Sequence, residues 1–312
     1  MKLFFEASNR LSDEIADLFD FLWSTSAAMW NLRWQVKGYL AVRGEEANMS
    51  ELSGRFIIGS GLSGVNFKKS YIDQSWEEQQ EQFAKFLLIN IFALYEQWVK
   101  DILTNIGYSH LECDLQRVTD SKRSQGIWYA INTICSTESS AIKNSFYSKY
   151  ITNKKYSAST LDNLMRCFKF FKECRNCIIH KGGIADKIMV TRYQQFRNVA
   201  TIGQLGINEV PLHNPVVLHQ KIKIELRGVV GFADVILRII ATCDAEFSRS
   251  FVAEKVFLKR WREFHQHKIV LPKPGTESRL HKVTKYIQTI GYPCPDDPSE
   301  METFLKTNNL IF

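Results

Sequence analysis

The sequence predicts a mainly α-helical protein, a helical bundle with a small β-hairpin insertion. Apolar residues recur at helical spacing through most of the 312-residue chain. Two later stretches, KIMVTRYQQF and PVVLHQKIKIEL, instead carry β-branched residues in partial alternation, which is typical of short strands. A hydrophobic content of 45% is ordinary for a globular protein, and the length allows a sizeable core.

The first two helical blocks flank a loop. Residues 9–36 repeat apolar residues at helical spacing and predict a long helix, with a candidate interruption at residues 24–26. Residues 59–70 are rich in Gly and Ser and predict a loop or linker. The strongest helix is expected between Ser75 and Gly107, because it opens with a capping-box pattern, closes on glycine and is apolar on most sides near its middle. It should therefore lie centrally.

Further helices are expected across residues 124–147 and 158–181, and then in GVVGFADVILRIIATCDAEF and AEKVFLKRWREFHQH. The tail contains five of the seven prolines and predicts an irregular extension. The expected organisation is an N-terminal helical region (1–70), a helical bundle with the β insertion (71–250), and a C-terminal helix with a Pro-rich extension (251–312).

Composition favours a cytoplasmic protein without a membrane segment, cofactor or metal. The apolar stretches are too short or too interrupted to cross a bilayer, and the first residues lack a signal peptide's apolar segment. Seven cysteines, an odd number without regular spacing, suggest reduced thiols. Cys174 and Cys177 form a C-x2-C pattern, but no second pair completes a zinc site, so a packing role is favoured.

Positive charge is concentrated in one segment. Between residues 154 and 197 ten Lys/Arg face three Asp/Glu, an excess that equals the +7 of the whole chain. Phe168, Phe170, Phe171 and Tyr193 are interleaved with these cations, a combination that suits a phosphate-rich partner. Solvated lysines on an amphipathic helix would give the same count.

Within this segment, CRNCIIHKGG places Arg175 and His180 near the end of an apolar helix. Five positions correspond to roughly 500° of rotation and about 7.5 Å of rise, a gap that a long arginine can bridge. Gly182 can adopt the left-handed conformation that ends a helix, and the negative end of the helix dipole then favours a protonated imidazole at His180. An imidazole beside a permanent cation suits a phosphodiester.

The same R-x4-H spacing occurs twice in RWREFHQH, as Arg260 with His265 and Arg262 with His267. That segment is highly charged and has no glycine stop. We interpret it as a solvated helix face and favour the first motif.

The stretch RNCIIHKGG resembles the signature of the HEPN superfamily, an arginine, a polar residue and a histidine at the end of a helix in a four- or five-helix bundle. NIFALYEQWVKDIL is similar to the family's earlier central helix, where Glu96 and Tyr95 match a recurring aromatic-glutamate pair. The resemblance covers about residues 75–250.

The resemblance implies a metal-independent endoribonuclease, commonly a toxin or antiphage-defence effector. Cleavage by the 2′-hydroxyl needs a base, an acid and a cation for the charge on phosphate. Because one chain offers one Arg–His pair, we expect a homodimer with a shared active site. Asn176 would position the phosphate or the imidazole, and Glu96 would orient Arg175. Lys169, Lys172, Lys181 and Tyr95 are the expected RNA contacts. The expected partners are RNA, with tRNA among the candidates, and an antitoxin or a phage-derived regulator.

Two other interpretations stay open. Arg175 can serve structurally, paired with Glu96 or Glu173, while His180 caps its helix. The same pocket can also belong to a non-catalytic helical module that binds RNA, a nucleotide or a protein.

Overall fold

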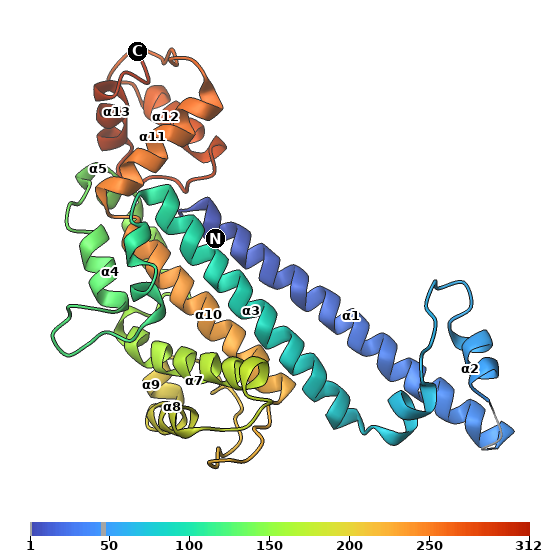
Figure 1. Ribbon diagram of the computed structural model, residues 1–312. Helices are drawn as coiled ribbons and strands as arrows, with labels where there is room; N and C mark the ends of the chain where they lie inside the picture. The colour runs from blue at the N-terminus through green and yellow to red at the C-terminus, as the bar shows by residue number, and fades with distance from the viewer. Residues whose placement is uncertain (1, 45–47) are drawn as a thin grey trace.

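The computed structural model describes residues 2–44 and 48–312, and every regular element within these ranges is a helix. Three long helices lie side by side: α1 (Glu6–Arg43), α3 (Trp76–Ile106) and α10 (Leu226–Phe247), as Figure 1 shows. The fourth main helix, α7 (Leu161–His180), packs against α3 and α10 and carries the predicted motif. The mainly α fold class is confirmed.

Helix α3 matches the prediction closely. The Ser75 hydroxyl accepts from the Glu78 N–H at 3.1 Å, and the Glu78 carboxylate accepts from the Ser75 N–H at 2.8 Å, so both halves of the capping box form. Gly107 closes the helix at φ 80°. Its buried residues include Leu87, Leu88, Ile91 and Phe92, which places α3 at the centre of the bundle.

Helix α1 is longer than predicted and continuous, so the expected interruption at residues 24–26 is wrong. The Ser24 hydroxyl donates to the Asp20 carbonyl at 2.8 Å. This bond satisfies the hydroxyl within the helix, because the hydroxyl shares a carbonyl of the preceding turn and occupies no backbone N–H.

The predicted β-hairpin insertion is also wrong, because the described residues contain only isolated bridges and no strand. KIMVTRYQQF forms α8 (Lys187–Arg197), where the Asp186 carboxylate caps the helix by accepting from the Met189 N–H at 2.9 Å. The second stretch is non-helical at residues 221–225, with Ile222 and Ile224 buried and Lys221 and Lys223 exposed. The alternation of apolar and polar residues arises because one face of this segment contacts the core, and it does not require pairing with a second strand.

Shorter helices complete the chain. The expected helical stretch 124–147 is broken into α4 (Ile127–Ile134), α5 (Ser140–Ile142) and the π turn Lys143–Tyr147, which leads into α6 (Ser148–Ile151). The other short elements are α2 (Met49–Phe56), the π turn Lys69–Asp73, α9 (Ile202–Leu205) and the 3-10 turns Ser109–Leu111, Asp114–Gln116 and Ala158–Thr160.

The C-terminal tail is not an irregular extension. Helix α11 (Phe251–His265) is followed by α12 (Glu277–Thr289) and α13 (Pro298–Thr307). Pro298 occupies the first turn of α13, where a missing N–H costs no hydrogen bond. Most tail prolines therefore separate or start helices instead of preventing them.

One hydrophobic core joins buried residues from all three regions expected from the sequence, from Phe4 to Ile311. A separate distal cluster, made of Val36, Leu52, Phe67 and Tyr71, lies where α1 meets α2 and the π turn that precedes α3. No helix in residues 2–44 or 48–312 is both long and apolar enough to span a membrane.

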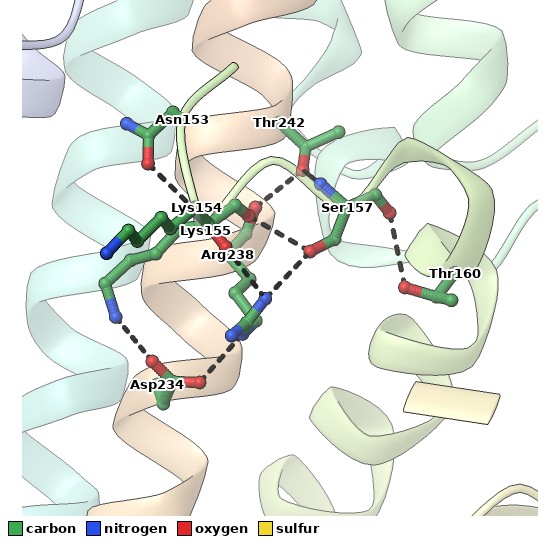
Figure 2. Close-up of polar contacts among 8 residues, drawn as sticks. All are labelled: Asn153, Lys154, Lys155, Ser157, Thr160, Asp234, Arg238 and Thr242. Carbon is green, nitrogen blue, oxygen red and sulfur yellow. Dashed lines mark hydrogen bonds and ion pairs between the residues drawn. The ribbon is translucent and has the colours of Figure 1, made fainter. Parts of the chain in front are cut away.

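A polar network fixes the loop that leads into α7 (Figure 2). Asp234 on α10 accepts from Lys155 and, at 2.8 Å, from the Arg238 guanidinium. Burial opposes ionisation of Asp234, but these two cations hold its pKa below the usual range. The Ser157 N–H donates to the Thr242 hydroxyl at 2.9 Å. The start of α7 is thus tied to α10.

A buried carboxylate fastens the start of α1 to α10. Asp244 accepts from the N–H groups of Phe4 at 2.6 Å and Phe5 at 3.1 Å. Complete burial raises the pKa of Asp244 to about 7. Because an unfolded aspartate has a pKa of about 3.9, the folded chain binds more protons here between about pH 4 and pH 7, and the free energy of unfolding falls as pH rises through that range.

Replacing Asp244 with asparagine should lower the free energy of unfolding by about 1–3 kcal/mol near pH 5, because the amide NH2 group puts a donor in place of one side-chain oxygen, opposite a backbone N–H. The gap to wild type should narrow toward about pH 8, since asparagine does not titrate. Urea unfolding followed by circular dichroism at pH 5 and pH 8 measures the loss of stability and its dependence on pH. Asp17→Asn, the same change at an exposed position of α1, is the control. A gap that widens with pH would contradict the assignment.

Candidate functional site

The end of α7 is built by two glycines, as predicted. The N–H groups of Lys181 and Gly183 both donate to the Cys177 carbonyl, at 3.1 and 2.8 Å. Gly182 has φ 59° and Gly183 has φ 80°, a left-handed backbone that favours glycine at both positions. His180 therefore stands in the last turn of the helix.

Arg175 is held from two sides. Its Nη2 lies 3.4 Å from Glu96 Oε2 on α3, and its Nη1 donates to Asn176 Oδ1 at 3.2 Å. The predicted pairing of Arg175 with Glu96 is present, and the side chain keeps 21% of its surface exposed. Its Nε is buried and has no hydrogen-bond partner among the described residues. The guanidinium is thus fixed in orientation yet reachable from solvent.

A chain of polar contacts continues from Asn176 to the end of the helix. Asn176 Nδ2 donates to Glu173 Oε2 at 3.3 Å, and Lys181 Nζ lies 2.7 Å from both Glu173 Oε1 and Asp186 Oδ2. Its hydrogen bonds to Asp186 and then to Glu173 are the main reason that the pKa of Lys181 is raised. Lys181 therefore stays protonated, and its charge is balanced by two carboxylates of the same chain, which the sequence did not indicate.

His180 is exposed. Within the described part of the chain its ring makes no hydrogen bond or ion pair, including none to Arg175. The imidazole is free to meet a ligand or a second chain.

Four cations form a basic cluster beside the motif: Arg117, Lys169, Lys172 and Arg192. The pKa of Lys169 is lowered to about 8, mainly by burial and then by the positive charges of the other three residues. Burial also lowers the pKa of Lys172, which interacts with the charges of Glu96 and Arg175. An anion here would offset this repulsion. Arg117 precedes α4, far from α7 in sequence, and no local pattern could have indicated it.

The aromatic residues of the region belong to the core. Tyr95 is fully buried and donates to the Leu115 carbonyl at 2.7 Å, so it is not available to RNA in this structure. Phe168, Phe170 and Phe171 are also buried. They support α7 and do not supply a stacking surface, contrary to the interpretation of the basic segment.

The other motifs carry less chemistry. Cys174 and Cys177 are buried, and burial raises the pKa of both thiols, in keeping with a packing role. No group of three or more His, Cys, Asp or Glu suited to a metal occurs in the described ranges. In the second R-x4-H pair the His265 ring packs 4.6 Å from that of Trp261, and burial lowers its pKa, so α11 is not a wholly solvated face.

The arrangement can bind a phosphate and move one proton. It provides an exposed imidazole, an oriented guanidinium and nearby cations, but only one such proton carrier per chain. Comparison of the chain with family models, curated proteins and solved structures returns no match.

Proposed function

We propose that the protein is a metal-independent endoribonuclease that cleaves RNA by 2′-hydroxyl attack and is active as a homodimer. The observation that carries the proposal is the exposed, unbonded His180 at the end of the helix on which Arg175 is fixed by Glu96. The sequence resemblance to the HEPN superfamily supports it. The basic cluster supplies cations for the RNA backbone.

In the proposed reaction, His180 of one chain removes the proton of the 2′-hydroxyl as the oxygen attacks phosphorus. The bond to the 5′-oxygen breaks, and His180 of the second chain donates a proton to that oxygen, leaving a cyclic phosphate. Arg175 stabilises the charge that grows on the phosphate oxygens. Glu96 and Asn176 act as positioning residues for the guanidinium, which they contact at 3.4 and 3.2 Å.

The same proposal makes the protein a cytoplasmic toxin or antiphage-defence effector. Its partners would be RNA, with tRNA among the candidates, and an antitoxin or phage-derived regulator. These assignments rest on the sequence resemblance.

Purified protein should cut RNA equally well with and without EDTA, because the proposed acid, base and cation are all side chains. The fragments should end in 2′,3′-cyclic phosphates, which a 3′-phosphatase leaves intact until acid opens the ring. Gel analysis of end-labelled RNA measures both results. A strict Mg²⁺ requirement would contradict the proposal and direct attention to the carboxylates.

A non-catalytic binding module is the second candidate function. Two ion pairs favour it: Arg175 with Glu96, and Lys181 with Glu173. In each, a cation that was predicted to act in catalysis or to contact RNA already has a carboxylate partner in the same chain. A module of this kind would bind RNA, a nucleotide or a protein without cleaving it.

A further inference from the structure

A cleft of about 1000 Å³ lies between the start of α3 and the extended segment that enters α10. One wall is formed by residues 221–227, the other by Asp73 and the first turns of α3, and Trp23 of α1, Asn214 and Val230 also line the cleft. Trp23 is 46% exposed, so it offers apolar surface to an occupant. No residue of the basic cluster lines this cleft.

The extended wall makes one isolated β-bridge on one of its sides. The Ile222 N–H donates to the Gly183 carbonyl and the Ala185 N–H to the Gln220 carbonyl, both at 2.9 Å, which forms an antiparallel bridge between Ile184 and Lys221. In such pairing, successive residues direct their backbone groups to opposite sides. The N–H and C=O groups of Lys221 and Lys223 therefore face away from Gly183, and they have no partner in the described chain.

The side chains of this edge alternate strictly. Ile222 and Ile224 are buried at 6% exposure each, while Lys221, Lys223 and Glu225 are exposed. A strand paired with this edge would place alternate side chains beside the two lysines. Acidic residues at alternate positions of an occupant fit that pattern.

The opposite wall determines the class of occupant. Asp73 and Glu77 line it, together with Glu78, which caps α3, and Glu81, which is paired with Lys85 at 2.7 Å. Carboxylates across the cleft from the lysines repel a phosphate backbone and disfavour RNA. A peptide with alternate acidic residues and a basic end complements both walls. Its backbone can also satisfy the free edge.

We propose that this cleft binds an extended, mixed-charge segment of a partner protein, which adds a β-strand to the edge at Lys221 and Lys223. The inference goes beyond the proposed nuclease activity and does not depend on it. The occupant's backbone pairs with the two lysines' free N–H and C=O groups. Its acidic side chains lie beside the two ammonium groups, and its basic end lies against the start of α3.

The test uses a fluorescent peptide of alternating glutamate and valine that ends in arginine, with binding to the full chain measured by anisotropy. Lys223→Glu should weaken binding by about tenfold, because an attractive cross-strand pair becomes repulsive. A peptide in which lysine replaces only the glutamate that lies beside position 223 should recover affinity for this variant, because Lys221 still requires its acidic neighbour. Lys282→Glu, the same change on the exposed surface of α12, should bind like wild type.

Backbone pairing is tested by two N-methylated versions of the peptide, methylated at alternate residues in opposite registers. Only one should bind, because only one register leaves the edge-facing N–H groups free. Absent binding, equal binding by wild type and Lys223→Glu, or indifference to both methylation patterns would overturn the proposal. Displacement of the peptide by single-stranded RNA, with RNA affinity lost in Lys223→Glu, would overturn it and assign the cleft to nucleic acid.

Discussion

Replacing His180 with alanine is expected to abolish RNA cleavage and leave the fold intact. The imidazole is exposed and makes no hydrogen bond within the described chain, so its removal costs no native contact. Loss of one positioned acid or base slows such reactions by about 10²–10⁴-fold, and the substitution removes both in a symmetric dimer. Initial rates on a labelled RNA measure the effect, with circular dichroism and urea unfolding as checks on the fold.

His281→Ala, the same change at an exposed position of α12, should cut RNA as wild type does. Wild-type expression should slow host growth, and His180→Ala should relieve this effect. If His180→Ala protein cuts RNA as fast as wild type, the nuclease assignment is wrong. Growth unaffected by the wild-type protein, together with no cleavage by it in vitro, would instead favour the binding module.

Replacing Arg279 with methionine is expected to lower the free energy of unfolding by about 3–5 kcal/mol, because it removes one partner of a buried ion pair. Arg279 on α12 is 2% exposed, and its Nε donates to Glu302 Oε1 on α13 at 2.5 Å. Its other nitrogens donate to the carbonyls of Pro272 and Phe312, at 2.7 and 2.6 Å. All three acceptors would lose their donor.

Urea unfolding followed by circular dichroism measures this loss, and the fluorescence of Trp261, a buried residue of α11, adds a signal from the same C-terminal helices. Arg262→Met, the same change on the exposed face of α11, is the matched control and should shift stability little. Equal stability of Arg279→Met and wild type would show that the three contacts do not organise the tail.

Sequence patterns predicted the elements whose ends carry local chemistry. Ser75 with Glu78 marks the start of α3, and Gly182 marks the end of α7, because each signal acts on backbone groups within one turn. The hairpin failed for the opposite reason. Asp186 caps a helix in which Met189 and Phe196 bury one face against α7, and these contacts outweigh the β-branched residues.

The tail failed because proline composition was interpreted without position. Pro298 sits where a helix tolerates it, and the buried Arg279 supplies tertiary bonds that no local pattern reveals. Composition alone therefore underestimated the order of the last fifty residues.

The candidate site was predictable only in part. The pairing of Arg175 with Glu96 follows from two helices whose sequences indicated them as neighbours. The charge that Arg117 adds to the basic cluster, and the ion pair of Lys181 with Asp186, depend on how loops fold back onto α7. Such contacts between distant segments leave no periodic trace in the chain.

The distal cluster bears on how the protein can change through evolution. Its four buried side chains share no members with the main core, although α1 runs through both. Substitutions or insertions at that tip can therefore accumulate without disturbing the packing around α7. The molecule thus has one end that can diversify while the other stays constrained.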